Sequence, residues 1–170
     1  MKFKLVLLAV LTMVLAACST TAPRYYSRTP FWTDDVAASG KPGANTLTGS
    51  ATFALSGNQM QPCGPIPVRL VPDSRYARQR FMELYGSDVS GAASGIGFNQ
   101  YGPETGDYRW LDSGAQTSCA NGNFSFQNVS DGTWYVVTTW VDSSNPKARS
   151  YSMFKRVVLA GGQPAQVTLP

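Results

Sequence analysis

Three cysteines and a complete absence of histidine limit the chemistry that this 170-residue chain can perform. Without histidine there is no Ser-His or Cys-His pair to activate a nucleophile, and no metal site that uses an imidazole. The adjacent carboxylates Asp34 and Asp35 lie in a stretch rich in proline and glycine, and no other pair is marked as a general acid and base. We therefore expect a protein that is not an enzyme, with no catalytic residue, no metal and no cofactor.

The first cysteine, Cys18, follows a segment typical of an export signal. Lys2 and Lys4 precede an apolar run over 5–17 that is too short to span a bilayer. The letters LAAC at 15–18 resemble the lipobox of bacterial lipoproteins. This resemblance implies that residues 1–17 are removed as a signal peptide and that Cys18 becomes the lipid-bearing N-terminus, acylated on its sulfur and on the new amine. An ordinary signal peptide with a coincidental cysteine is the alternative.

The residue after the cysteine bears on the destination of the protein. In proteobacterial lipoproteins a residue other than aspartate at this position implies transfer to the outer membrane, and Ser19 stands here. Two or more acyl chains anchor a protein persistently without spanning the membrane. We therefore expect lipid anchoring at the bacterial outer membrane, on its periplasmic face.

The other two cysteines, Cys63 and Cys119, would then fold in a compartment that oxidises thiols. A disulfide between them is the natural interpretation, and closing a loop of about 57 residues would stabilise the fold by roughly 4 kcal/mol. Free buried thiols and a redox pair are the alternatives. Neither cysteine belongs to a C-x-x-C motif, which disfavours redox catalysis.

The charge of the chain gives no sign of nucleic-acid binding. Lys2 and Lys4 belong to the signal, so 12 basic and 10 acidic side chains remain after its removal. A surface that binds nucleic acid requires clustered basic residues and a larger excess of basic over acidic side chains. We expect no nucleic-acid partner.

Four arginines do gather within a short stretch: Arg69, Arg75, Arg78 and Arg80. Because arginine early in a helix opposes the helix macrodipole, local helix stability does not explain them. One hypothesis is contact with an anion such as a lipid phosphate, lipopolysaccharide or a peptidoglycan carboxylate. The other is a solvated charged face, with Glu83 nearby.

We expect residues 18–45 to be the lipidated cysteine and a flexible tether, because they contain prolines and glycines and no regular spacing of apolar residues. Aromatic side chains are unusual in such a linker. Tyr25, Tyr26, Phe31 and Trp32 either pack on the flank of the domain or lie in the membrane interface. The remaining residues, 46–170, are enough for one domain.

Within this domain the apolar pattern predicts short strands and one helix. The period of two, or a continuous apolar run, indicates seven strands over 46–55, 66–70, 108–112, 123–127, 134–141, 151–159 and 165–169. Ser74 as an N-cap and Gly86 as a terminator bound a helix over 75–85. The stretch 86–107 holds six glycines and is expected to be a surface loop.

The glycine and aromatic spacing also resembles a known family. Carboxypeptidase regulatory-like domains carry the signature G-x-F-x-F-x-N-[LV]-x-x-G-x-[YW], and its order is followed here by Gly122, Phe124, Phe126, Val129, Gly132, Thr133, Tyr135 and Val137. A closer likeness is to a proteobacterial lipoprotein group, carried by Val68, Leu70, Pro72, Ser74, Tyr76, Tyr85 and Gly86. The resemblance implies an all-β fold: a seven-stranded transthyretin-like or immunoglobulin-like β-sandwich with one short inserted helix. It implies no activity, since the shared positions serve packing and turns.

Together these features favour a non-catalytic, membrane-anchored module of the cell envelope that binds an envelope protein or a cell-wall component. A secretion-apparatus lipoprotein of the outer membrane is one alternative, because some of these also use a transthyretin-like sandwich. A periplasmic inhibitor of a hydrolase is another, and it would present the glycine-rich stretch 86–107 to its target.

Overall fold

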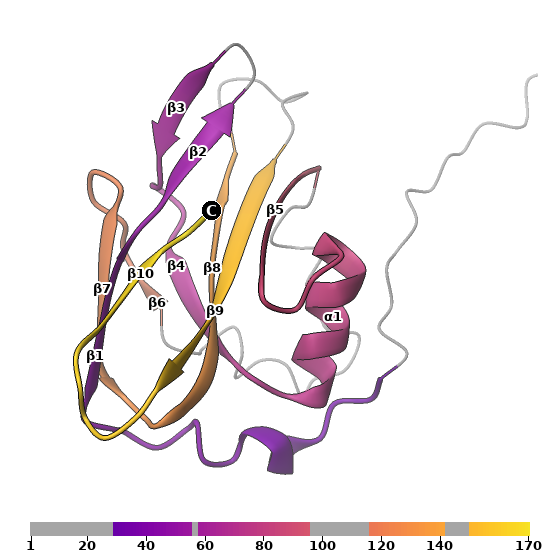
Figure 1. Cartoon of the computed structure of the whole chain (residues 1–170), viewed down its shortest axis with the longest axis vertical. Helices are drawn as coiled ribbons and strands as arrows, with labels where there is room; N and C mark the ends of the chain where they lie inside the picture. Colours follow the sequence, from indigo (N-terminus) through magenta and orange to yellow (C-terminus); the bar gives the residue numbers. More distant parts are fainter. Residues whose placement is uncertain (1–28, 56–57, 96–115, 142–149) are drawn as a thin grey trace, which may run out of the picture.

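The computed structural model describes residues 29–55, 58–95, 116–141 and 150–170. A short 3-10 helix, η1 (Thr33–Val36), precedes the first strand, and one α-helix, α1 (Arg75–Tyr85), interrupts the strands. The described strands are β1 (Asn45–Ser50), β2 (Thr52–Leu55), β3 (Gln59–Pro62), β4 (Val68–Pro72), β5 (Ser90–Ser94), β6 (Gln116–Thr117), β7 (Asn123–Val129), β8 (Gly132–Trp140), β9 (Tyr151–Leu159) and β10 (Ala165–Thr168). Figure 1 shows two layers of strands with α1 on the outer side of one of them.

The main core lies between these two layers. One layer is a three-stranded sheet of order β10-β1-β7, and the other is a five-stranded sheet of order β5-β9-β8-β4-β6. Leu47 and Phe124 from the first sheet meet Leu70, Val136 and Met153 from the second in one buried cluster. This arrangement confirms the predicted all-β sandwich with one short helix.

The helix α1 builds a second, smaller core on the outer face of the five-stranded sheet. Phe81 of α1 stacks on Tyr135 of β8 at a centroid distance of 4.2 Å and contacts Phe154 of β9 at 4.4 Å. Successive side chains of a strand point to opposite faces. Tyr135 therefore faces α1, whereas its neighbours Trp134 and Val136 belong to the main core.

The bounds of α1 confirm the helix predicted over 75–85. The Ser74 hydroxyl oxygen accepts a hydrogen bond from the Ala77 backbone N–H at 3.0 Å, as expected of an N-cap. Gly86 ends the helix with φ of 72°, a left-handed conformation that glycine adopts without steric cost. Its N–H donates to the Met82 carbonyl at 2.9 Å.

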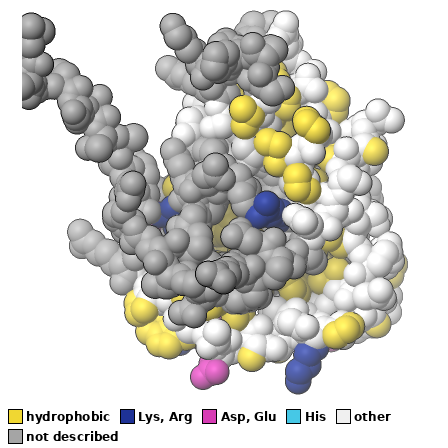
Figure 2. Space-filling model, turned by 180° about the vertical axis from the view of Figure 1, so that it is seen from behind, with side chains coloured by type: hydrophobic (Ala, Val, Ile, Leu, Met, Phe, Trp, Pro, Cys, Tyr) yellow, Lys and Arg dark blue, Asp and Glu magenta, His cyan; other side chains and the backbone are white. Residues whose placement is uncertain are grey.

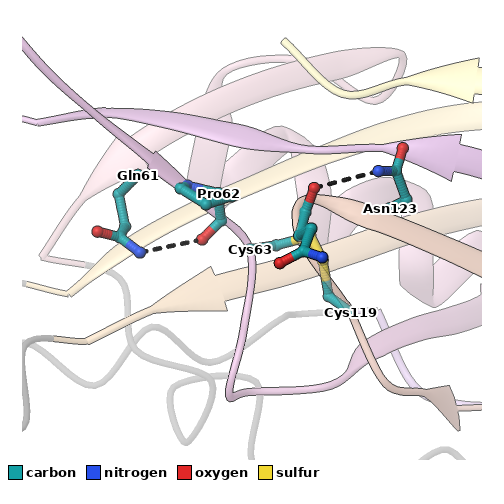
Figure 3. Close-up of a disulfide and its surroundings, with 6 residues drawn as sticks. Gln61, Pro62, Cys63, Cys119 and Asn123 are labelled. Atoms are coloured by element: carbon teal, nitrogen blue, oxygen red, sulfur yellow. Dashed lines mark hydrogen bonds between the residues drawn. A yellow bond between two sulfur atoms is a disulfide. The ribbon is translucent and has the colours of Figure 1, made fainter.

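The predicted disulfide between Cys63 and Cys119 is present (Figure 3). Cys63 directly follows β3, and Cys119 lies between β6 and β7, so the bond joins the end of the two-stranded β2–β3 sheet to the connection between the five-stranded and three-stranded sheets. The Cys63 N–H also donates to the Ala51 carbonyl at 3.0 Å. The segment before β4 is thus fixed by both a covalent bond and a backbone hydrogen bond.

The number of strands differs from the prediction, since the described residues contain ten rather than seven. The strand expected over 46–55 is divided at Ala51, because β1 pairs with β7 whereas β2 pairs with β3. Three strands were not predicted: β3, β5 and the two-residue β6. β3 and β5 lack apolar alternation, and β5 lies in the expected loop 86–107. The strand expected over 108–112 falls outside the described residues.

The start of the folded body also differs from the expected boundary at Thr46. The chain contacts the domain from Phe31, whose ring meets Tyr76 of α1 edge-on at 6.3 Å. Val36 and Asn45 are buried, and the Asn45 amide donates to the Val129 carbonyl and to the Asp131 carboxylate, both at 2.8 Å. The later part of the expected tether therefore packs on the body, while residues 18–28 lie outside the described part.

Candidate functional site

The four arginines grouped by the sequence do not share one surface. Arg75 and Arg78 point outward from the first turn of α1, with 58% and 51% of their side chains exposed. Arg80 is buried, with its guanidinium 4.0 Å from the Glu83 carboxylate, and Arg69 is half-buried on β4. The candidate site is therefore the region around the start of α1.

Asp73, the residue between β4 and the N-cap of α1, is the centre of this region. The Arg78 guanidinium binds it with two hydrogen bonds, from Nε to Oδ1 and from Nη2 to Oδ2, both at 2.9 Å. Arg156 of β9 donates from Nη2 to Oδ2 at 2.9 Å, and the Tyr135 hydroxyl donates to Oδ1 at 3.2 Å. We call these four residues the Asp73 cluster.

Arg156 and Tyr135 were not among the residues expected at this site. β8 and β9 pair so that Tyr135 lies opposite Arg156, which brings both side chains to the face that α1 covers. The only sequence signal for Arg156 was that it is one of two adjacent charged residues, Lys155 and Arg156, within the strand predicted over 151–159. The strand register that places it beside Asp73 was not available from the sequence.

A second ion pair joins the segment before β1 to the same turn of α1. The Asp35 carboxylate accepts two hydrogen bonds from the Arg75 guanidinium, at 3.0 Å and 2.8 Å, and one from the Arg75 backbone N–H at 3.3 Å. The guanidinium also lies over the Trp32 ring, 4.0 Å from its centroid. A carboxylate at a helix N-terminus is favoured by the helix dipole. We call residues 31–36, held in this way, the strap.

The contacts in this region shift the pKa values of Asp73, Tyr135 and Asp35. Burial alone would raise the pKa of Asp73, but hydrogen bonds from Arg78 and Arg156 outweigh it and hold this pKa below its ordinary value of 3.8. Burial and the adjacent Asp73 charge raise the pKa of the Tyr135 hydroxyl well above its ordinary value. A hydrogen bond from Arg75 lowers the pKa of Asp35.

These shifts limit what the Asp73 cluster can do chemically. At neutral pH Asp73 is ionised and Tyr135 is protonated, so neither group exchanges a proton near neutrality, as a general acid or base must. Arg75 and Arg78 each use two of their five guanidinium N–H groups on a carboxylate. The other N–H groups can donate to an external acceptor. The region is thus suited to binding and not to proton transfer.

The guanidinium groups, and not the carboxylates, face outward. Asp35 and Asp73 have only 18% and 8% of their side chains exposed, far less than Arg75 and Arg78. Trp32 beside them is 39% exposed. An approaching molecule would therefore meet donor groups and an aromatic ring.

A different surface lies at the opposite end of the sandwich. Trp140 at the end of β8 and Tyr151 at the start of β9 form a half-buried aromatic pair with centroids 5.9 Å apart. The β2–β3 hairpin, which carries the exposed Met60, reaches the same upper end in Figure 1. Figure 2 shows hydrophobic side chains gathered at that height on the reverse face. We call Trp140, Tyr151 and Met60 the aromatic end.

The lipidation residue expected at Cys18 lies outside the described part of the chain. Within that part, no helix is long and apolar enough to cross a membrane, and no group of three or more potential ligands could hold a metal ion.

The likeness of this chain to known proteins lies in its fold. No protein-family model matches the sequence. No curated protein matches it either. The fold is similar to the crystal structure of a "putative carbohydrate binding protein" from Pseudomonas aeruginosa, with a TM-score of 0.60, 20% identity, and coverage of 83% of this chain and 97% of that chain. At this identity the likeness concerns the fold, and it extends over nearly the whole of the neighbour.

Proposed function

We propose that this protein is a lipid-anchored, non-catalytic binding module of the bacterial cell envelope, with carbohydrate as its ligand class. The ligand class rests on the likeness of the fold to that of the "putative carbohydrate binding protein". The likeness extends over 97% of that protein's chain. The transthyretin-like assignment and the position at the outer membrane belong to the same proposal.

The anchoring part rests on the N-terminal sequence. The LAAC letters at 15–18 follow a charged and apolar export signal. The Cys63–Cys119 disulfide supports export, because disulfides persist in oxidising compartments such as the periplasm. It also leaves Cys18 as the one cysteine outside the disulfide.

For the ligand, the aromatic end is the surface that best suits a sugar. A sugar ring presents C–H groups to an aromatic face and hydroxyl groups to nearby polar side chains. Trp140 and Tyr151 are only half-buried and combine a large apolar surface with a polar N–H and hydroxyl. Trp134 and Tyr135, by contrast, are buried in the two cores and cannot stack on a ligand.

Titration calorimetry of a soluble Cys18→Ser protein tests this function, with peptidoglycan fragments and a panel of soluble oligosaccharides as probes. We expect one glycan class to bind, and Trp140→Ala to weaken its binding at least tenfold. Trp32→Phe, at the other end of the molecule, is the matched control and should bind as the parent does. Thermal unfolding of each variant separates lost binding from lost folding.

Three results would overturn the carbohydrate proposal. One is a folded parent protein that binds no glycan. Another is binding that is unchanged in folded Trp140→Ala and also in Tyr151→Ala. The third is inhibition of an envelope hydrolase without glycan binding, which would favour the inhibitor function instead.

A further inference from the structure

The strap determines the end of the domain at which the chain enters the body. Asp35 and Trp32 hold it against Arg75, so it meets the body at the start of α1, which is the lower end in Figure 1. Ten residues, 19–28, separate Cys18 from the first described residue. An unconstrained chain of ten residues has an r.m.s. length of about 18 Å. With lipid on Cys18, the lower end is therefore the part of the domain nearest the membrane.

The side chains exposed at this end match the chemistry of phospholipid headgroups. Arg75 and Arg78 present guanidinium N–H groups outward while their carboxylate partners are largely covered. Such groups bind phosphate oxygens with short, charge-assisted hydrogen bonds. Trp32 adds an exposed amphipathic ring, a residue type enriched at the level of the headgroups.

A fourth side chain extends this surface across the sheet. Val158 of β9 is 72% exposed and lies opposite Thr133 of β8, whose carbonyl accepts a hydrogen bond from the Asp73 N–H at 2.9 Å. Val158 is two residues from Arg156 on the same strand, so its side chain lies on the same face of the sheet and borders the Asp73 cluster. Trp32, Arg75, Arg78 and Val158 together form a surface of outward cations with apolar side chains among them.

We propose that this surface lies against the phospholipid headgroups of the membrane that holds Cys18, so that the aromatic end points away from that membrane. The proposal rests on the anchoring part of the proposed function and does not depend on carbohydrate binding. One basic residue beside an anionic membrane shifts a population about fivefold. Two unpaired basic residues would bias the orientation of an anchored domain by about thirtyfold. Because Asp35 and Asp73 offset part of the charge of Arg75 and Arg78, we expect a smaller bias, and recruitment from solution would be weak.

Site-specific fluorescent labels test the orientation in the full-length lipoprotein, purified from membranes and reconstituted into phosphatidylethanolamine/phosphatidylglycerol vesicles. Val158→Cys and Met60→Cys provide matched positions, because both side chains are exposed and they lie at opposite ends of the sandwich. With Cys18 acylated and the other two cysteines in a disulfide, each new thiol is the labelling site. We expect brominated lipids to quench the label at position 158 at least threefold more than the label at position 60.

Intrinsic fluorescence provides a second measurement that needs no label. The chain has four tryptophans. We expect brominated lipids to quench the parent protein, and this quenching to decrease in Trp32→Phe and to persist in Trp140→Phe. Equal quenching of both labels, or stronger quenching at position 60, would overturn the proposal. Loss of Trp32 quenching on addition of a soluble glycan would instead assign this surface to a carbohydrate.

The failure of this proposal can be distinguished from failure of the proposed function. The mass of the N-terminal peptide reports lipid on Cys18, and calorimetry of the soluble protein reports glycan binding. An acylated protein that binds glycan but shows no difference between the two labels would contradict the orientation alone.

Discussion

Asp73 connects three elements of the fold through one carboxylate. It directly follows β4, and it accepts hydrogen bonds from Arg78 of α1, Tyr135 of β8 and Arg156 of β9. Its side chain is 8% exposed, so the cost of removing it from water is offset only while these donors are present. The cluster therefore fixes the start of α1 on the sheet and keeps Arg78 in position at the surface.

Replacing this carboxylate should destabilise the protein in a pH-dependent way. We expect Asp73→Asn to lower the free energy of unfolding at pH 7 by about 1–3 kcal/mol, because two arginines lose their charged partner. The native pKa of Asp73 lies below its ordinary value of 3.8, so its contribution is complete above that value and is lost as the pH falls through the lower, native pKa. Urea unfolding at several pH values measures this.

The Asp34→Asn variant is the control, since Asp34 is an exposed carboxylate of the strap. The difference between parent and Asp73→Asn should diminish in acid. A difference that stays constant from pH 7 to pH 2 would show that the carboxylate charge is not the source of the stability.

Some contacts of individual residues could be predicted from the sequence, and others could not. The Cys63–Cys119 pair followed from the compartment and from the parity of the remaining cysteines. The grouping of Arg69 and Arg80 with Arg75 and Arg78 rested on sequence proximity, but the faces of a strand and a helix separate neighbours in the chain. The partners Asp73 and Arg156 are 83 residues apart, and only strand register brings them together.

Among the elements, α1 could be predicted to its end residues because its signals are local. A capping serine, an apolar face at helical spacing and a terminal glycine lie within 13 residues of chain. The strands β3 and β5 could not be predicted, since Gln59–Pro62 and Ser90–Ser94 carry no apolar alternation. Their extended conformation comes from pairing with β2 and β9, in keeping with the strong dependence of strand formation on context.

The N-cap of α1 is directly testable. Ser74→Ala removes the hydroxyl that accepts from the Ala77 N–H, and we expect it to lower the free energy of unfolding by about 1 kcal/mol. Gln79→Ala, at an exposed position of the same helix, should change it by less than about 0.5 kcal/mol. Chemical denaturation of both variants gives the comparison, and equal stabilities would contradict the assigned cap.

For the whole molecule, the disulfide is the principal covalent constraint. The double variant Cys63→Ser/Cys119→Ser should lose about 4 kcal/mol of stability, mainly because its unfolded chain is less restricted. The parent protein treated with a reductant should unfold at the same denaturant concentration as this variant. A parent protein whose unfolding midpoint is unchanged by a reductant, under conditions that reduce the bond, would contradict this account.

The molecule as a whole has two chemically different ends. The start of α1 carries outward arginines and Trp32, close in the chain to the expected lipid, while the aromatic end carries Trp140, Tyr151 and Met60. The sandwich itself could be predicted from alternating apolar residues. The position of the two different ends could not be predicted from the sequence, because it depends on contacts between the strap and α1 that only the folded structure reveals.

Cys18 is the residue on which the proposed membrane anchoring and the proposed orientation of the domain both depend. The most direct test is mass spectrometry of the N-terminal peptide of the protein purified from bacterial membranes. We predict a peptide that begins at Cys18 and carries acyl chains on both the sulfur and the new amino group. A peptide that begins at any other residue, or an unmodified Cys18, would contradict the proposed membrane-anchored function.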